Sequence, residues 1–217
     1  MARTKLYLDT GKTKKMMGEA IFSVCKTSSN RARIDRELDK SSNRLRAEFD
    51  AHAVTQEIAG GPEVRDNPSG TLGGYGGLFS FIGFTAGSDP LAPIRRIIAE
   101  QRFQIRKSNG VLKSGNVVTM ILEGPVAKEI FAVTHMPWAN GSSWARGIEQ
   151  GISGMGQYLN TEYLAGWSGQ GVQTKSPIAR NGTQAASKFN NKPYISAMIA
   201  KATSEAVRSV TSGNLIS

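Results

Sequence analysis

The stretch from Asn67 to Pro90, NPSGTLGGYGGLFSFIGFTAGSDP, constrains this chain most, because it combines great backbone freedom with a dense apolar run. Five of its glycines lie within eight positions: Gly70, Gly73, Gly74, Gly76 and Gly77. Glycine loses more conformational freedom on folding than any other residue, so a cluster of this density needs a reason. The apolar run that follows, Leu78 to Phe84, predicts a buried strand.

A phosphate cradle is the functional alternative for a glycine cluster, and the sequence argues against it. The stretch has no GxxxxGK[ST] pattern, and GGYGGLF lacks the GxGxxG spacing that precedes a helix. We therefore expect no bound cofactor. The five glycines are instead predicted to pack in the chain's own core or against a neighbouring subunit. The same role is expected for Gly147 and Gly151, which lie one turn apart in a predicted helix from Ser142 to Leu159.

Residue types that build reactive sites are scarce. Cys25 is the only cysteine, which excludes an internal disulfide, and with only His52 and His135 a zinc site is not expected. For His135, a structural role is favoured over that of a general base, because no nucleophile and orienting group can be placed around it. We therefore expect the chain not to be an enzyme, with no catalytic and no metal-binding residues.

The net charge of +10 predicts an acidic partner, either nucleic acid or the surface of another protein. Between Gly166 and Asn191 the chain is rich in small and polar residues, and it carries Lys175, Arg180 and Lys188 without any acidic residue. Unstructured loops of this length are uncommon in compact domains and are often functional. We predict that these three side chains line a channel or a docking surface. No pattern of a dedicated DNA-reading motif accompanies them.

Hydrophobic periodicity predicts both helices and strands. The helices are expected over residues 12–26, 28–49, 51–59, from Ser88-Asp89-Pro90 onward, 142–159 and 193–210. The strands are expected over Leu78–Phe84, over RFQIR at 102–106, and as an antiparallel hairpin of NVVTMILE with EIFAVTH, residues 116–123 and 129–135.

Together these elements predict an α+β fold. It has N-terminal helices, a central mainly antiparallel sheet with packed helices, a long basic loop and a C-terminal helix. We expect residues 1–28 to form a basic N-terminal arm and short helix, 29–211 a single α+β domain, and 212–217 a polar tail. Within the arm, Leu6-Tyr7-Leu8 is a candidate for adding to the sheet or groove of a partner. No run is long and apolar enough to span a membrane, and the reducing cytoplasm is the expected site of synthesis.

Three motifs taken together resemble a family of virion structural proteins from tailed bacteriophages. They are VTQEIAGGP at 54–62, SGTLGGYGGLFSFIGF at 69–84 and PWANGSSWARGIEQGISGMG at 137–156. The last motif, with strands before it and a Gly/Ser/Arg-rich loop after it, looks like the neck or tail-completion proteins of the head-to-tail junction. The basic region from Met1 to about Lys26 has no counterpart in that pattern.

The resemblance implies a ring of identical subunits in the virion, assembled in the host cytoplasm around the channel for the genome. Its implied partners are head, portal or tail proteins, with nonspecific contact to genomic DNA. Two alternatives stay open. One is another tail or baseplate structural protein, and the other is a sequence-nonspecific nucleic-acid-binding protein.

Overall fold

The computed structural model describes residues 3–5, 28–64, 66–72, 77–112, 115–137, 139–151, 158–160, 172–174 and 189–211. The chain divides into two compact units. Unit 1 comprises Met1–Arg46, Ile97–Val126 and Ile199–Ser217, and unit 2 comprises Ala47–Arg96 and Ala127–Met198. The predicted helix over 12–26 and the segment Leu6-Tyr7-Leu8 lie outside the described residues. The predicted domain bounds stay a prediction.

Helix α2 (Ser28–Ala51) is the longest described helix and begins at the serine pair that the sequence marks as its start. Its predicted apolar stripe, Ile34, Leu38, Leu45 and Phe49, is buried, which confirms the helix. Between these residues the Ser42 hydroxyl donates to the carbonyl of Leu38 at 2.9 Å and accepts the backbone N–H of Phe103 at 3.0 Å. A buried polar side chain with both roles filled costs the core little.

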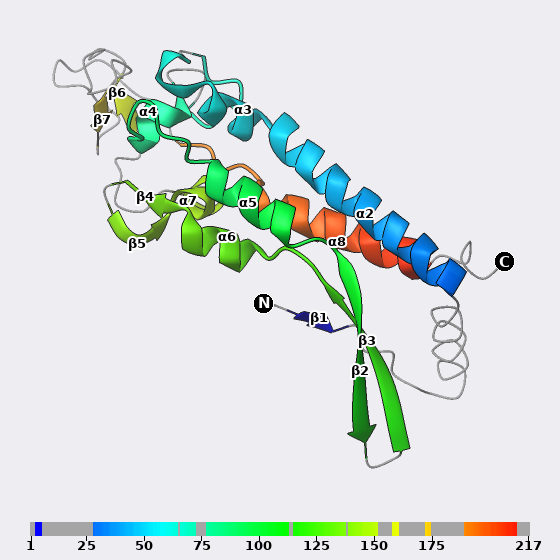
Figure 1. Ribbon diagram of the computed structural model, residues 1–217. Helices are drawn as coiled ribbons and strands as arrows, with labels where there is room; N and C mark the ends of the chain where they lie inside the picture. Colours follow the sequence, from blue (N-terminus) through cyan, green and yellow to red (C-terminus); the bar gives the residue numbers. More distant parts are fainter. Residues whose placement is uncertain are drawn as a thin grey trace. The chain divides into compact units, whose positions relative to one another are not determined.

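The sheet of unit 1 is antiparallel in the order β1-β3-β2, with β1 at Arg3–Lys5, β2 at Gln104–Leu112 and β3 at Gly115–Glu123 (Figure 1). The predicted start of the sheet at RFQIR and the NVVTMILE strand are confirmed. The predicted partner of that strand is wrong, because EIFAVTH lies mostly in helix α6 (Ala127–Val133) and β3 pairs with β2. A short apolar run is compatible with the periodicity of a helix and with that of a strand, and here the run after Pro125 forms a helix.

Unit 1 is also held by polar contacts between its helices. Arg44 Nη1 of α2 lies 2.8 Å from Glu205 Oε2 of helix α8 (Ile195–Thr211). Arg46 Nη2 donates to the carbonyl of Ala99 in helix α5 (Ala92–Glu100) at 2.9 Å. The predicted helices are confirmed as α5 and α8. The side chain of Asp89 caps α5 by accepting the N–H groups of Leu91 and Ala92.

Unit 2 consists of short elements. After α3 (Ala53–Ala59) and the 3-10 helix η1 (Gly61–Glu63), these are α4 (Leu78–Ile82), α6, β4 (His135–Met136), β5 (Ala139–Ser143), α7 (Trp144–Gln150), β6 (Tyr158–Asn160) and β7 (Val172–Thr174). Strand β4 pairs with β5 and β6 with β7, both antiparallel. Strand β7 lies inside the stretch that was predicted to have no secondary structure.

The strand predicted over Leu78–Phe84 is wrong, because Leu78–Ile82 forms helix α4. Gly83, at φ 87°, ends this helix and its N–H reaches the carbonyls of Phe79 and Ser80. A left-handed residue is a common helix terminator and glycine takes it without strain. The apolar side chains Leu78, Phe79, Phe81 and Ile82 are buried. The predicted burial is therefore confirmed, although the predicted conformation is wrong.

The helix predicted from Ser142 to Leu159 is shorter in the structure. It begins as predicted, since the Ser143 hydroxyl caps α7 by accepting the N–H of Arg146 at 3.1 Å. It ends at Gln150, because Gly151 takes φ 93° and leaves the helical conformation, and Leu159 lies in β6. The α+β fold class is confirmed: among the described residues, β1, β2 and β3 form a three-stranded antiparallel sheet in unit 1, and β4-β5 and β6-β7 form two-stranded antiparallel sheets in unit 2.

Candidate functional site

A buried carboxylate in α3 holds the start and the end of the glycine-rich segment. The side chain of Glu57 is 2% exposed. Its Oε1 atom accepts from Asn67 Nδ2 and from the N–H of Leu78, both at 2.8 Å, and Oε2 accepts from the N–H of Ser69 at 3.3 Å. One side chain therefore ties α3 to residues on both sides of the glycine cluster.

Asn67 extends this network toward the glycines. Its Oδ1 atom accepts the N–H of Leu72 at 2.7 Å, and its Nδ2 atom also lies within hydrogen-bonding distance of the hydroxyls of Ser69 and Thr71. We call Glu57, Asn67, Ser69 and Thr71 the Glu57 anchor. It fixes Leu72 and Leu78, the residues near the two ends of the cluster, through their backbone N–H groups.

The glycines that were predicted to pack closely have different surroundings. A Cβ atom on Gly77 would lie 2.3 Å from the carbonyl oxygen of Val64, so this glycine packs against the chain's own backbone. Gly70 has φ +66°, and its nearest side-chain neighbour is Lys192. Gly73, Gly74 and Gly76 lie outside the described residues. Their packing stays a prediction, as does any contact of the segment with a second subunit.

The end of the predicted basic loop lies on the glycine-rich segment. The backbone N–H of Asn190 donates to the carbonyl of Thr71 at 2.8 Å, and Asn190 Nδ2 donates to that of Gly70 at 3.3 Å. The ring of Phe189 stacks on Phe81 of α4 with centroids 5.8 Å apart. The two stretches that the sequence singled out therefore meet in unit 2. Lys175, Arg180 and Lys188 lie outside the described residues, so their role stays a prediction.

Residues 191–196 contact the last turn of α7 and the glycine that ends it. The N–H of Lys192 donates to the carbonyl of Ile148 at 3.0 Å, and Glu149 Oε1 accepts the N–H of Ser196 at 2.6 Å. Gly151, the last residue before the excursion, lies next to the side chain of Asn191. We call residues 70–71, 148–151 and 189–192 the loop base. Gly147 is buried in α7, whereas Gly151 ends the helix at φ 93° and ψ 143°, which corrects its predicted place inside the helix and leaves its packing role a prediction.

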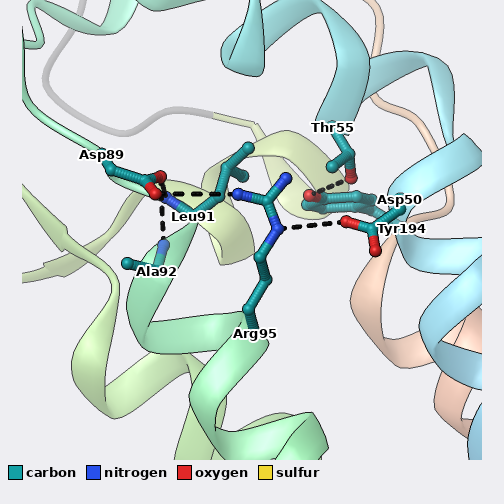
Figure 2. Close-up of polar contacts among 7 residues, drawn as sticks. All are labelled: Asp50, Thr55, Asp89, Leu91, Ala92, Arg95 and Tyr194. Atoms are coloured by element: carbon teal, nitrogen blue, oxygen red, sulfur yellow. Dashed lines mark hydrogen bonds and ion pairs between the residues drawn. The ribbon is translucent and has the colours of Figure 1, made fainter.

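A second polar cluster supports α8 where it begins (Figure 2). Tyr194 is fully buried and its hydroxyl lies 2.8 Å from Thr55 Oγ1 of α3, while Arg95 Nε donates to Asp50 at 3.1 Å and Arg95 Nη1 lies 3.7 Å from Asp89. Burial raises the pKa of the Tyr194 phenol, so the hydroxyl stays protonated. These contacts link Tyr194, just before α8, to α3, and Arg95 of α5 to Asp50 and Asp89.

His52 joins the same cluster as the N-terminal cap of α3. Its Nδ1 atom accepts the N–H of Val54 at 3.3 Å, and its ring lies on Tyr194 with centroids 4.9 Å apart. Desolvation by burial lowers the pKa of His52, against the opposing effect of a hydrogen bond to the backbone of Pro193. A neutral imidazole is required here, because a protonated Nδ1 has no lone pair to accept with. His135, by contrast, is exposed in β4.

Every polar group of the Glu57 anchor has a partner within the chain, and among the described residues no group of three or more His, Cys, Asp or Glu side chains is placed to hold a metal ion. No described helix is long and apolar enough to cross a membrane. Sequence reasoning missed Glu57 and Asn67, although Glu57 shares the apolar stripe of α3 with Val54 and Ile58.

Comparisons with known proteins add no relative. No family model, no curated protein and no solved structure matches the chain.

Proposed function

We propose that the chain is a structural component of a tailed-phage virion, a ring-forming neck or tail-completion protein at the head-to-tail junction. The observation that carries the proposal is the meeting of the three resembling motifs in unit 2. Glu57 of the first motif binds Ser69 and Leu78 of the second. Trp144 of the third packs edge-on against Phe84 of the second, with ring centroids 5.6 Å apart.

The use of polar groups in these motifs also supports a structural role. Glu57 and Thr71 of these motifs are hydrogen-bonded to Asn67, and Ser69 to Thr71, and none of the described polar side chains forms a nucleophile with a base and an orienting group. The glycine-rich segment and the basic loop start from a common loop base. Glycine-rich and basic stretches that meet at one base suit contact with other subunits or with nucleic acid.

The first test is the size and shape of the purified protein. Native mass spectrometry and negative-stain electron microscopy are expected to show closed rings of identical subunits, since heterologous contacts close into rings when the rotation permits. In a phage that carries this gene, loss of the protein is expected to leave filled heads and separate tails. A chain that stays monomeric at high concentration, together with intact virions in its absence, would refute the proposal.

The second test concerns the predicted basic residues. Replacing Lys175, Arg180 and Lys188 together with glutamine is expected to impair retention of DNA in assembled particles, because each subunit of a ring contributes its positive charge to the same channel. The matched control replaces three exposed basic residues elsewhere, Arg36, Arg96 and Lys128, with glutamine. Equal titres and equally stable filled heads for both triple variants would remove the channel role.

The nucleic-acid-binding alternative makes a different prediction. A sequence-nonspecific binding protein remains monomeric or dimeric and binds duplex DNA in a salt-dependent way without assembling. Under that alternative the loop triple variant weakens DNA binding and lowers the salt dependence, whereas ring formation is never observed. A tail or baseplate protein would form oligomers but would leave head completion unaffected when it is absent.

A further inference from the structure

The positive charge of the chain is unevenly divided between the two units. Unit 1 contains 18 lysine and arginine residues and 8 acidic residues, whereas unit 2 contains nine of each, and together these make up the 27 basic and 17 acidic residues of the chain. The whole net charge of +10 therefore belongs to unit 1. The predicted basic loop lies in unit 2, so unit 1 needs a binding surface for an anion of its own.

Three basic side chains of α2 lie along one exposed side of the helix. Arg33, Lys40 and Arg44 are all exposed, and their i, i+7, i+11 spacing places them in one stripe. With a rise of about 1.5 Å per residue, the stripe is about 16 Å long. The exposed acidic residues of α2 within unit 1, Asp35 and Asp39, lie on another side of the helix, and each is paired with an arginine there.

Two carboxylates lie between these cations and orient them. Lys40 Nζ lies 2.6 Å from Glu37 Oε1, and Arg44 Nη1 lies 2.8 Å from Glu205 Oε2 of α8. In both pairs the cation is the more exposed partner, since the side chains of Lys40 and Arg44 are 70% and 62% exposed and those of Glu37 and Glu205 are 35% and 27% exposed. Exposed ion pairs contribute at most about 1 kcal/mol, so they leave the cations able to bind a further anion.

Helix α8 extends this stripe. Figure 1 shows α2 and α8 running in opposite directions, and the Arg44–Glu205 ion pair joins them. Arg208 is exposed and follows Glu205 by three residues, so it lies on the same side of α8, one turn further along. We call Arg33, Lys40, Arg44 and Arg208 the basic face. It contains four cations against the two carboxylates that lie among them.

We propose that the basic face binds the phosphate backbone of duplex DNA. Each strand of a duplex carries one phosphate per about 3.4 Å of helix axis, so a stripe of about 16 Å spans about five phosphates. Three of the four cations are arginines, whose planar guanidinium groups bind phosphate through two parallel hydrogen bonds. Phosphate contacts carry no sequence information, so the binding is expected to be independent of sequence. The inference rests on the DNA contact of the proposed function and places part of it in unit 1.

The salt dependence of DNA binding tests the proposal. Fluorescence anisotropy with a labelled duplex of mixed sequence compares the full-length parent with the triple variant Arg33→Gln, Lys40→Gln, Arg208→Gln. Arg44 is kept, because its ion pair joins α2 to α8. The matched control replaces Arg36, Arg96 and Lys128 with glutamine, which removes the same charge from exposed positions outside the basic face.

Each phosphate contact contributes about 0.9 to the slope of log K against log salt concentration, so the slope is expected to fall by about 2–3 in the basic-face variant and by less than about 1 in the control. The affinity is expected to fall by about tenfold or more in the basic-face variant alone. Arg33→Lys with Arg208→Lys keeps the charge and should keep the slope. If this conservative variant loses the slope as well, the effect is structural and the proposal is overturned.

Equal slopes and affinities for the basic-face variant and the control, or a parent protein that binds no DNA, also overturn the proposal. Sedimentation of the same samples without DNA separates this inference from the proposed ring. Rings that bind no DNA refute the basic face and leave the ring standing. A monomer whose DNA binding depends on the basic face supports the face and contradicts the ring.

Discussion

Replacing Glu57 with alanine removes the group that holds the glycine-rich segment to α3. The backbone N–H of Leu78 loses a buried acceptor at 2.8 Å, and that of Ser69 loses one at 3.3 Å in a half-buried position. Asn67 loses one partner but keeps the hydroxyls of Ser69 and Thr71. Leu78 N–H is therefore the main group left unsatisfied.

The magnitude follows from these losses. A buried donor without a partner costs about 1–3 kcal/mol. The lost Cγ methylene adds about 0.8 kcal/mol, and the half-buried N–H of Ser69 adds part of a second penalty of the same kind. Relief of the desolvated carboxylate offsets part of this sum, so we expect Glu57→Ala to lower the free energy of unfolding by about 2–4 kcal/mol. Glu57→Gln keeps one acceptor oxygen but turns an amide N–H toward that of Ser69, and about 1–2 kcal/mol is expected.

Urea denaturation followed by far-UV circular dichroism and tryptophan fluorescence measures both variants. With a slope of about 2 kcal/mol per molar urea, Glu57→Ala is expected to shift the midpoint down by about 1–2 M. Glu63→Ala is the matched control, because Glu63 is an exposed glutamate in η1. A surface change of this kind is worth less than about 0.5 kcal/mol. The reasoning is refuted if Glu57→Ala and Glu63→Ala shift the midpoint equally.

Three further predictions concern the same unit. The pKa of His52 is lower in the folded chain than in the unfolded chain, so below about pH 6.5 the unfolded chain binds the proton more readily. The free energy of unfolding is therefore expected to fall as the pH falls. A pH series of melting temperatures should show a weaker pH dependence for His52→Asn than for the parent protein. Gly77→Ala is expected to cost about 1–3 kcal/mol, because its Cβ would lie 2.3 Å from Val64 O, and an unchanged urea midpoint would contradict this close approach. Gly147→Leu in the buried position of α7 should lower the thermal midpoint by overpacking, whereas Gln150→Ala, which loses one exposed hydrogen bond, should not, and equal midpoints would count against tight packing there.

The elements that the sequence predicted correctly are those with a long apolar period. In α2 the stripe from Ile34 to Phe49 spans more than four turns, and no strand reading fits it. The start of α5 was equally clear, because Asp89 and Pro90 mark it chemically as well as by pattern. Burial was predicted more reliably than conformation, since Leu78, Phe79 and Phe81 are buried as expected although they lie in a helix.

Two of the wrong predictions share one physical cause. Runs such as Leu78–Ile82 and Ala127–Val133 are too short for their period to be decided by the sequence alone, and tertiary context selects the helix. The end of α7 was missed for another reason. Gly151 was interpreted as a small residue for close packing, whereas its φ of 93° makes it a terminator, and the sequence does not separate these two uses of glycine.

The sequence around Glu57 contains a pattern from which its burial could have been predicted. Val54, Glu57 and Ile58 follow the i, i+3, i+4 spacing of a buried helix stripe, so the sequence places a carboxylate on an apolar face. A buried carboxylate requires hydrogen-bond donors, and its neighbourhood must therefore supply several. What the sequence could not supply is their identity, because Asn67, Ser69 and the N–H of Leu78 come from a stretch whose conformation is set by that same carboxylate.

The loop base brings residues of two separate stretches of the chain together in unit 2. The excursion that begins after Gly151 ends at Asn191 beside it, and a loop with adjacent ends costs entropy that grows only slowly with its length. The hydrogen bond from Asn190 to Thr71 brings the end of that excursion to the glycine-rich segment. In the proposed ring, we expect the glycines and basic side chains of these two stretches to contact other subunits or DNA.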